Sequence, residues 1–558
     1  MTDASTPNTI TGRNAFIALL RSEGVSRMFG NPGTTELPIM HALADYPDMG
    51  YVLALQEAVV VAMADGFARA SGELAACNVH VAPGLGNAIC SIYTAFMSGT
   101  PMIVTAGQQE QGHGLTEPLL YAPLVPIATP VVKWATEVSR IEDLPRILRR
   151  AAKIATTHPT GPVFISLPGD ILNDEAAIEL GESTRVDTAV RPTDAAIESL
   201  AKRLLAARKP CVIAGHEIAV GDAFAEVVAF AETLGTPVYQ QTVPQGAHFP
   251  SEHPAFMGSL GRDQKRVRQL LGEHDLIVCL GADLLKMSVW SETDPLPPDT
   301  GVIMIGQRDW EMGKNWPAEI AIRADLRETL RALLRVLKAQ AGPARLAASK
   351  GMLDMYAARN WSATRAAKAQ QVVARGPGSP LHPEWVMMRL SDTLPNDAVV
   401  VEEVLTAAPA LLAFWPYRDR HSFYGNVSGG IGWGIAAAVG IQAALPRRRV
   451  VAVIGDGSAM YSIQALWTAA NAKLPVTFVI LNNGGYQILK NRLKAYHGND
   501  KPIGMDFADP PIDASGLARA MGVAAERVDT AEGFDAALAR AMTATGPSLI
   551  EVMVQKLT

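Results

Sequence analysis

The sequence predicts an α/β fold made of three doubly wound parallel-sheet domains. Short apolar runs alternate with helix-period stretches along the whole chain, which is typical of a parallel sheet covered by helices. At 558 residues the chain is too long for one hydrophobic core, and its 47 glycines and 37 prolines suit many short loops. We expect domains at 1–185, 186–345 and 381–558, with a surface linker at 346–380.

Composition argues against several classes of function. The net charge is −6 and no basic block occurs, so nucleic acid is not an expected partner. No apolar run approaches the roughly 18 residues of a membrane span, and the polar start lacks a signal core. The cysteines Cys77, Cys90, Cys211 and Cys279 are scattered in apolar surroundings. They predict buried thiols in a reducing compartment, and hence a cytoplasmic protein without a membrane partner.

The first domain alternates strand and helix signals. Thr11 can cap a first helix, and the strand at 25–30 ends in the turn Gly30-Asn31-Pro32-Gly33-Thr34-Thr35. Further strands are expected at 51–55, 75–81, 102–107 and 163–168, with helices at 57–72 and from about Pro83. The second domain repeats this alternation with strands at 211–215, 237–241, 276–283 and 301–306. No phosphate-binding fingerprint follows a strand there, so that domain is predicted to be structural.

The third domain contains the most informative stretch, 450–486. A buried strand at 450–454 ends in Gly455-Asp456-Gly457-Ser458, and a helix pattern then continues to about Lys473. A second strand at 476–481 is followed directly by Asn482-Asn483-Gly484-Gly485. Ligands of open parallel sheets bind beyond the carboxyl ends of the strands. Asp456 and Asn483 offer the hard oxygens that suit Mg²⁺ carrying phosphate ligands, so a metal–diphosphate site is predicted here.

The last strand, 548–554, is introduced by Thr-Gly-Pro, as is the strand at 163–168. This echo suggests that the first and third domains share a topology.

The pair of turns resembles the binding motif of thiamine diphosphate (ThDP). With it, the chain is similar over its whole length to the superfamily of ThDP-dependent 2-oxo acid decarboxylases and acetohydroxyacid synthases, and within it to the benzoylformate decarboxylases. The segments that carry this resemblance are GNPGTTELP (30–38), YVLALQEA (51–58), HVAPGLGNA (80–88), IVTAGQQ (103–109), VIGDGSAMYSIQALWTAA (453–470) and LNNGGY (481–486).

The resemblance implies an order of pyrimidine-binding, central and diphosphate-binding domains. It also implies ThDP and Mg²⁺ as cofactors, and active sites shared between two subunits of a homodimer, usually within a homotetramer. The implied metal ligands are Asp456, Asn483 and the carbonyl of Gly485. The implied cofactor contacts are Glu57, Asn87, Leu405, Thr406, Gly429, Gly430, Ile431, Asp456, Gly457, Ser458, Asn483, Gly485 and Tyr486.

Three residues are implied to be catalytic. Glu57 would hydrogen-bond the aminopyrimidine of ThDP and so promote deprotonation of the thiazolium. His80 matches an active-site histidine and could move protons near neutral pH. Thr34 stands where the family carries a serine, and its extra methyl group would narrow the pocket. Glu117, Leu119 and Leu120 lie where related enzymes shape the substrate pocket.

One departure from the family concerns a second histidine. Ser288 falls at its position, and no histidine occurs between His274 and His382. His113 and His497 are candidates to replace it, although each also fits an ordinary exposed loop histidine.

Three functions follow as hypotheses. The first is a ThDP- and Mg²⁺-dependent lyase that decarboxylates a 2-oxo acid through a C-2 carbanion and enamine. The second is a carboligase of the acetohydroxyacid synthase type, which the missing histidine favours and Gln108-Gln109 disfavours. The third is a non-catalytic structural or regulatory subunit, against which the intact Glu57, Asp456 and Asn483 argue. FAD in the central domain stays open as an additional cofactor.

Overall fold

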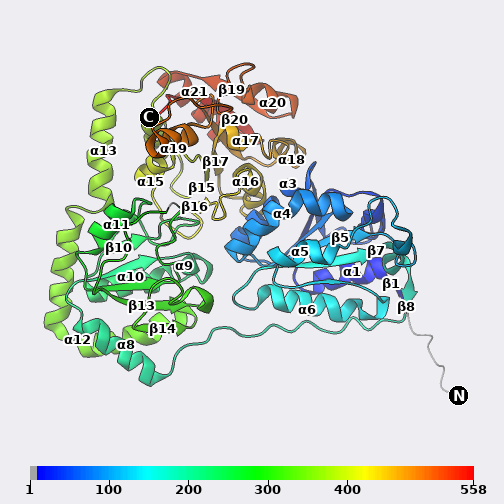
Figure 1. Cartoon of the computed structure of the whole chain (residues 1–558), viewed down its shortest axis with the longest axis horizontal. Helices are drawn as coiled ribbons and strands as arrows, with labels where there is room; N and C mark the ends of the chain where they lie inside the picture. The colour runs from blue at the N-terminus through cyan, green and yellow to red at the C-terminus, as the bar shows by residue number, and fades with distance from the viewer. Residues whose placement is uncertain (1–8, 289, 558) are drawn as a thin grey trace.

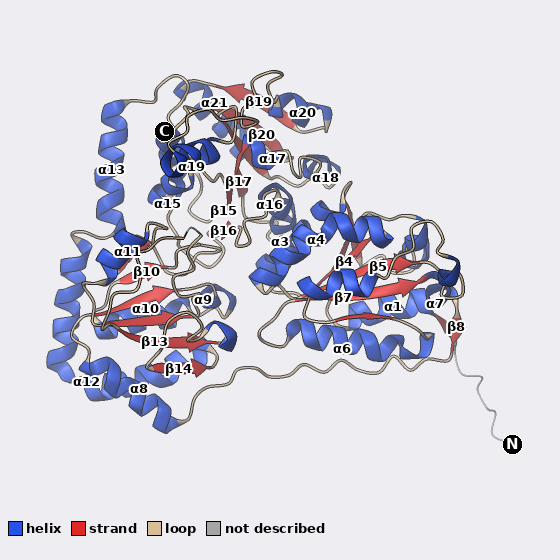
Figure 2. Cartoon of the chain, in the orientation of Figure 1, coloured by secondary structure: helices blue, strands red, loops and turns tan. Residues whose placement is uncertain are grey.

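The computed structural model describes residues 9–288 and 290–557, and it contains three six-stranded parallel sheets with helices on both faces (Figures 1 and 2). The sheets lie within 27–168, 210–323 and 399–553. The predicted α/β class with three doubly wound parallel sheets is therefore confirmed. None of the described helices combines the length and the apolar character that crossing a membrane requires.

The N-terminal domain has the strand order β3-β2-β4-β5-β7-β6. Its strands are β2 (Arg27–Gly30), β3 (Gly50–Leu53), β4 (Ala75–Val79), β5 (Met102–Gln108), β6 (Ala135–Glu137) and β7 (Pro162–Pro168). Its helices are α1 (Gly12–Ser22), α2 (Leu37–Leu43), α3 (Glu57–Ser71), α4 (Val81–Ser98), α5 (Leu124–Ala128), α6 (Leu144–Thr156) and α7 (Gly169–Asn173). A small antiparallel pair joins β1 (Ile10–Thr11) to β8 (Glu175–Ala176), and the Thr11 hydroxyl caps α1 as predicted.

The C-terminal domain repeats this topology with the order β16-β15-β17-β18-β20-β19. Its strands are β15 (Val399–Glu403), β16 (Phe423–Gly425), β17 (Val450–Gly455), β18 (Thr477–Asn482), β19 (Ala524–Val528) and β20 (Ser548–Met553). Its helices are α14 (Pro383–Thr393), α15 (Ala408–Phe414), α16 (Trp433–Ala444), α17 (Asp456–Ala459), α18 (Ala465–Asn471), α19 (Gln487–His497), α20 (Ala514–Ala520) and α21 (Ala531–Thr543). The similarity of topology suggested by the Thr-Gly-Pro echo is thus present in the strand order.

The central domain follows the order β11-β10-β9-β12-β13-β14, the order of a dinucleotide-binding sheet. Its strands are β9 (Pro210–Ala214), β10 (Val238–Gln240), β11 (Phe256–Ser259), β12 (Leu276–Leu280), β13 (Gly301–Gly306) and β14 (Ile320–Arg323). Its helices are α8 (Asp194–Ala206), α9 (Glu217–Val220), α10 (Phe224–Leu234), α11 (Gln264–Leu271) and α12 (Leu326–Ala357).

The predicted linker at 346–380 consists mainly of helix. It contains the end of α12, which kinks at Gly342, and the whole of α13 (Trp361–Arg375). Alanine, arginine and lysine are good helix formers, which explains this outcome. The extended connection lies instead at 177–193, where the chain crosses from the N-terminal to the central domain without helix or strand (Figure 1).

Two local expectations were wrong. The single helix expected from Ser458 to about Lys473 is interrupted between α17 and α18. The backbone there makes bonds to the third preceding carbonyl, and the Ser462 hydroxyl donates to the Gly432 carbonyl at 2.5 Å. Cys90 is exposed, whereas the other three cysteines are buried. It stands on the face of α4 that is turned toward the Gly430 backbone.

Helices α3 and α16 join the N- and C-terminal domains and lie side by side in Figure 1. The backbones touch where glycines remove the side chains. A Cβ on Gly66 would stand 2.4 Å from the Ala437 carbonyl oxygen, and one on Gly440 would stand 1.9 Å from that of Met63. The contacts run in opposite order along the two helices, so the helices are antiparallel. This orientation decides which residues can share a site.

Candidate active site

Glu57 begins α3 at the carboxyl edge of the N-terminal sheet. The Gln56 side chain caps the helix by accepting from Ala58 N at 2.6 Å, so the helix starts at the glutamate. The Glu57 carboxylate is 7% exposed and accepts from Asn31 Nδ2 at 3.1 Å and from Asn87 Nδ2 at 3.0 Å. Two amide donors therefore fix a nearly buried carboxylate in one orientation and give each of its oxygens a partner.

His80 is held by a carboxylate that sequence reasoning missed. Its Nδ1 lies 2.7 Å from Glu36 Oε2, and Glu36 is 1% exposed. The same carboxylate accepts from the backbone N–H groups of Gly33 and Gly107 at 2.8 and 2.9 Å. A proton on Nδ1 is favoured by this arrangement, which leaves Nε2 available for proton transfer.

The hydroxyl that contacts this pair belongs to Thr35. Thr35 Oγ1 donates to Glu36 Oε1 at 2.7 Å and lies 3.4 Å from His80 Nδ1. Thr34 is exposed on the same turn, at the start of the 3₁₀ helix η1 (Thr34–Glu36). Within one chain Thr34 thus faces outward from the carboxyl edge.

Asp456 stands at the carboxyl edge of the C-terminal sheet, directly after β17. It is 4% exposed, and its oxygens accept from Gly457 N and Gly484 N, both at 2.8 Å. Burial raises the pKa of Asp456, and these backbone N–H groups oppose that rise. A buried carboxylate at such a turn can bind a cation, and the neighbouring backbone N–H groups can bind the anion that accompanies it.

Asn483 joins Asp456 across the turn that follows β18. Gly485 N lies 3.3 Å from Asp456 Oδ2 and 3.2 Å from Asn483 Oδ1, so two side-chain oxygens converge on one donor. Asn482 has a structural role instead, because its amide donates to the buried Glu551 at 2.7 Å. Gly485 has no room for a side chain, since a Cβ there would stand 2.4 Å from the Met505 carbonyl oxygen.

One pocket brings most of the predicted diphosphate-side residues together. Leu405, Thr406, Asp456, Gly457, Ser458, Asn483, Gly485 and Tyr486 all line it. Leu405 adopts a positive φ of 32°, a strained conformation that is characteristic of functional loops. Gly429, Gly430 and Ile431 lie on the neighbouring loop that leads into α16 rather than in this pocket.

The loop before α16 is tied to the sheet by Glu403, another residue missed from sequence. Its carboxylate accepts from Gly434 N at 2.5 Å and from Gly432 N. Glu403 pairs in register with Ile454, two residues before Asp456. Burial raises the pKa of Glu403 to about 8, although these backbone donors oppose the rise.

Glu57 and Asp456 do not meet within one chain. Arg69 of α3 stacks over the ring of Trp433, the first residue of α16, at 4.8 Å. Glu57 precedes Arg69 by twelve residues, which is about 18 Å of helix. Glu57 therefore lies at the far end of α3 from the edge of the C-terminal sheet that carries Asp456.

The position of the missing second histidine and both candidates to replace it are exposed. Ser288 and His113 lie on surface loops, and His497 ends α19. His113 belongs to the loop after β5, at the same carboxyl edge as His80. Glu117 and Leu119 of that loop are exposed as well, and Leu120 is partly exposed with a positive φ of 75°.

The residues present fit Mg²⁺ bound together with a diphosphate. No cluster of three His, Cys, Asp or Glu side chains that could hold a metal occurs in 9–288 and 290–557, so a cage of such side chains is not formed there. Asp456 and Asn483 nevertheless offer two hard oxygens that converge beside the backbone of Gly485. Mg²⁺ commonly takes one or two protein oxygens and completes its shell with phosphate and water.

In the central domain, groups of the protein fill part of the carboxyl edge where a dinucleotide such as FAD would bind. The backbones after β9 and β12 approach closely, because a Cβ on Gly215 would stand 2.2 Å from Ala282 Cα. After β13, the Glu217 carboxylate already accepts from the N–H groups of Gln307 and Arg308 at 2.7 and 3.3 Å. A side chain of the protein thus occupies the place where an anionic ligand would bind.

Three models of thiamine pyrophosphate (ThDP) enzymes match the chain. They describe the N-terminal TPP binding domain at residues 10–118, the central domain at 197–333 and the C-terminal TPP binding domain at 406–552. Benzoylformate decarboxylase of Pseudomonas aeruginosa is 34% identical over 552 residues, covering 98% of this chain and 99% of the relative. Acetolactate synthase isozyme 3 large subunit of Escherichia coli is 30% identical, covering 85% of this chain and 82% of the relative.

Solved structures agree with these matches. The ThDP-dependent 4-hydroxybenzoylformate decarboxylase of Rhodococcus jostii superimposes with a TM-score of 0.87 at 31% identity, covering 98% of this chain and 99% of the other. Benzoylformate decarboxylase of Polynucleobacter necessarius gives a TM-score of 0.87 at 30% identity with the same coverage.

Proposed function

The chain belongs to the thiamine pyrophosphate enzyme family, and we propose that it decarboxylates an aromatic 2-oxo acid with the help of ThDP and Mg²⁺. It is a benzoylformate decarboxylase-like ThDP enzyme. The relatives of the acetolactate synthase group match it at lower identity, 26–30%.

The Glu36–His80 pair is the observation that carries the choice of decarboxylation. Release of an aldehyde requires a proton at the carbon that lost CO₂, whereas carboligation requires that this proton arrive slowly. A histidine oriented through Nδ1 by a buried carboxylate is a built proton donor and acceptor. It therefore favours an aldehyde as the product.

The cofactor roles follow from the two carboxyl edges. When bound, ThDP would supply a nucleophilic carbon for addition to the ketone and a cationic ring that can accept the electron pair left by CO₂. Glu57, held by Asn31 and Asn87, would bind the aminopyrimidine. Asp456, Asn483 and the Gly485 carbonyl would hold Mg²⁺, with the diphosphate lying against Gly457 and Ser458.

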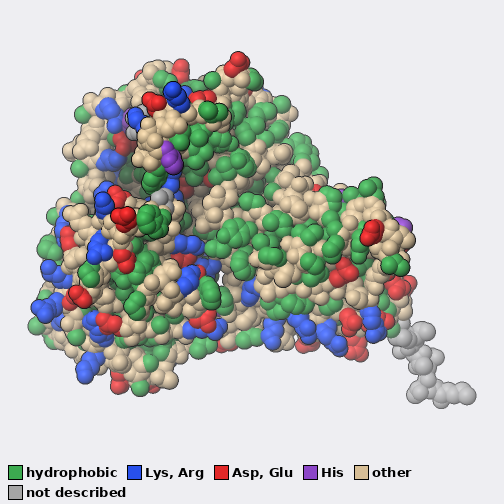
Figure 3. Space-filling view, viewed as in Figure 1, with side chains coloured by type: hydrophobic (Ala, Val, Ile, Leu, Met, Phe, Trp, Pro, Cys, Tyr) green, Lys and Arg blue, Asp and Glu red, His purple; other side chains and the backbone are tan. Residues whose placement is uncertain are grey.

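A homodimer with shared sites would bring these two edges together. Glu57 lies about 18 Å along α3 from the edge that carries Asp456 in its own chain. Both edges also expose large apolar side chains, which is unusual for a surface without a partner. They include Leu55, Leu115 and Leu119 on one domain and Met460, Tyr461 and Ile503 on the other. Figure 3 shows hydrophobic side chains gathered over the face where the two domains meet. We further propose that two such dimers assemble into a tetramer.

An apolar substrate suits the same edge. Leu115, Leu119 and Tyr121 follow β5 near His80 and are 93%, 86% and 40% exposed. Side chains of this kind would pack against an aryl ring, while the 2-oxo acid group faces His80.

Product analysis tests this function. The purified protein with ThDP and Mg²⁺ is given benzoylformate, a branched 2-oxo acid or pyruvate, with and without an acceptor aldehyde. We expect CO₂ and free aldehyde, fastest from benzoylformate, and product formation about 10³-fold slower in a matched Glu57→Gln preparation. A 2-hydroxyketone as the main product would identify a carboligase instead. Absence of any product from all three substrates would refute both reactions.

A further inference from the structure

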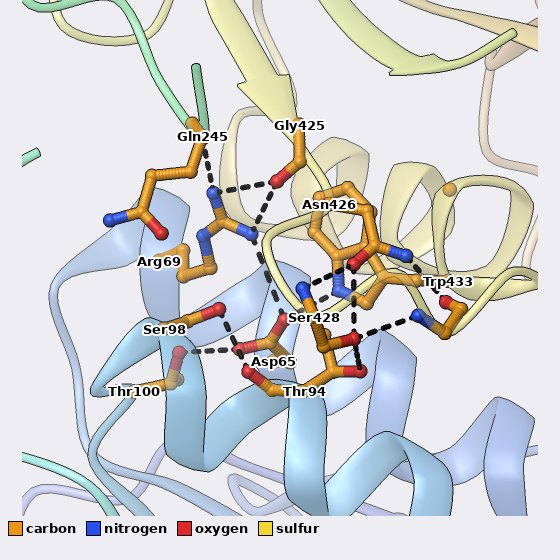
Figure 4. A network of polar contacts seen from close by, with 12 residues as sticks. Asp65, Arg69, Thr94, Ser98, Thr100, Gln245, Gly425, Asn426, Ser428 and Trp433 are labelled. Atoms are coloured by element: carbon orange, nitrogen blue, oxygen red, sulfur yellow. Dashed lines mark hydrogen bonds and ion pairs between the residues drawn. The ribbon is translucent and has the colours of Figure 1, made fainter. Parts of the chain in front are cut away.

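Helix α3 makes polar contacts of different kinds at its two ends. At its first residue it carries Glu57, with the amides of Asn31 and Asn87 around it. About two and three turns later it carries Asp65 and Arg69, which take part in a buried network with the C-terminal domain of the same chain (Figure 4). The second set of contacts has no place in the function described above.

Asp65 and Arg69 hold both ends of the loop 425–433. Asp65 is fully buried and accepts from Trp433 Nε1 at 2.5 Å, and also from the Thr100 hydroxyl. Arg69 donates to the Gly425 carbonyl at 3.3 Å and to the Gln245 carbonyl of the central domain. The two side chains lie 3.8 Å apart. The loop that contains Gly429, Gly430 and Ile431 is thereby anchored where it begins and where it ends.

Thr94 of α4 holds the middle of the loop. Its hydroxyl lies 2.7 Å from the Ser428 hydroxyl, which accepts from Gly430 N at 3.0 Å. Asn426 closes the loop by donating to the Gly430 carbonyl and by accepting from Ser428 N at 3.0 Å. Glu403 and Ser462 also hold the loop near its end, because Glu403 accepts from Gly432 N and Ser462 donates to the Gly432 carbonyl.

The loop needs such support because its backbone is unusual. Gly429 and Gly432 have φ values of 80° and 98°, which only glycine adopts easily, and glycine has many alternative conformations when it is released. A loop of this kind is positioned by its contacts rather than by its own propensity.

We propose that Arg69 of α3 and Thr94 of α4 are positioning residues for the cofactor-contact loop 425–433 of their own chain. Through Glu57 and Arg69, each α3 then serves two active sites. Its Glu57 end acts in the site built on the partner's C-terminal domain, and its Arg69 end supports the site built on its own. This proposal rests on the shared active site of the proposed function.

Cofactor affinity gives the first test. Thr94→Val removes one hydroxyl and keeps the shape of the side chain, so we expect the Kd of ThDP to rise about fivefold. Thr94→Ser should restore the wild-type value, because it restores the hydroxyl. Ser71→Ala is the matched control, since the Ser71 hydroxyl donates to the Phe67 carbonyl and accepts from Glu73 N, both within the N-terminal domain and away from the loop. Unchanged ThDP affinity in Thr94→Val would overturn the role of Thr94.

Mixed oligomers test the assignment of the two ends. A Glu57→Gln chain and an Arg69→Met chain are co-expressed with different tags and purified through both. In one of the two sites, the intact Glu57 comes from the Arg69→Met chain, and the intact loop 425–433 comes from the Glu57→Gln chain. We expect the activity and the KM for ThDP to equal those of a Glu57→Gln/wild-type mixture. The Arg69→Met protein alone, by contrast, should show a raised KM for ThDP.

The opposite outcome is equally clear. If Arg69 served the site that contains its own Glu57, the mixture would show the raised KM of the Arg69→Met protein, and the proposal would fail. The proposed function fails by a different result, namely an unchanged kcat in Glu57→Gln alone. If Arg69→Met does not fold, Thr94→Val replaces it in the same mixture, with the same two outcomes.

Discussion

The carboxyl edges of the N- and C-terminal sheets share a strand order but differ in chemistry. At the N-terminal edge each carboxylate contacts catalytic-type side chains: Glu57 accepts from two asparagines, and Glu36 contacts His80 in addition to two backbone N–H groups. At the C-terminal edge, by contrast, Asp456 and Glu403 accept from backbone N–H groups. In our proposal, the difference means that one topology serves proton transfer at one edge and holds a charged cofactor at the other.

The largest difference between the edges should appear when Glu57 is changed. Glu57→Gln keeps the size of the side chain but removes the carboxylate, so we expect kcat to fall by about 10³-fold. The Kd of ThDP should change little, because the diphosphate is bound at the other edge. Steady-state kinetics and calorimetry measure the two quantities. An unchanged kcat would contradict the role of Glu57.

Changing Asp456 should give the reverse pattern. Asp456→Asn removes the one carboxylate proposed to bind Mg²⁺, so the Kd of ThDP in the presence of Mg²⁺ should rise by about 100-fold. Saturating cofactor should recover part of the activity. Asp397→Asn is a matched control at the amino end of the same sheet, where Asp397 is exposed. Equal effects of the two substitutions on cofactor affinity would contradict the assignment.

A smaller effect is expected at Glu36. Glu36→Gln leaves His80 in place but loosens its orientation, so kcat should fall by about 10- to 100-fold and the fraction of 2-hydroxyketone should rise. The effects of Glu36→Gln and His80→Ala should not add, because the two residues act as a unit. Product ratios and a double-mutant cycle measure this. Additive losses would show that Glu36 only stabilises the fold.

The smallest effect concerns Glu403 and pH. Its pKa is raised from 4.5 to about 8 by burial, so between these values the folded protein holds a proton that the unfolded chain has released. The free energy of unfolding should therefore fall as the pH rises through this window, by up to about 1.4 kcal/mol per pH unit. Glu403→Gln should flatten this slope in denaturant unfolding. An identical slope in the variant would show that Glu403 does not titrate there.

Much of the fold could be predicted from the sequence, because the signals for it are local. Buried parallel strands are short apolar runs, and their ends are marked by glycine-rich turns such as those at Gly455 and Gly484. The same locality made the binding turns visible, since Asp456 and Asn483 directly follow their strands. In one place a local pattern misled because of a distant contact. Ser462 donates to the Gly432 carbonyl and interrupts the helix expected at 458–473.

The partners of the predicted residues were decided only by the tertiary structure. Glu36 lies 44 residues from His80, and Asn31 lies 26 residues from Glu57, so no sequence period connects them. Glu403 reaches Gly432 and Gly434 through the pairing of β15 with β17. The antiparallel packing of α3 on α16 likewise separates Glu57 from Asp456. The sequence alone determined which chemical groups stand at the strand ends, because a strand end is a local feature. Which of those groups meet depends on how whole sheets and helices pack, and that is a property of the folded chain.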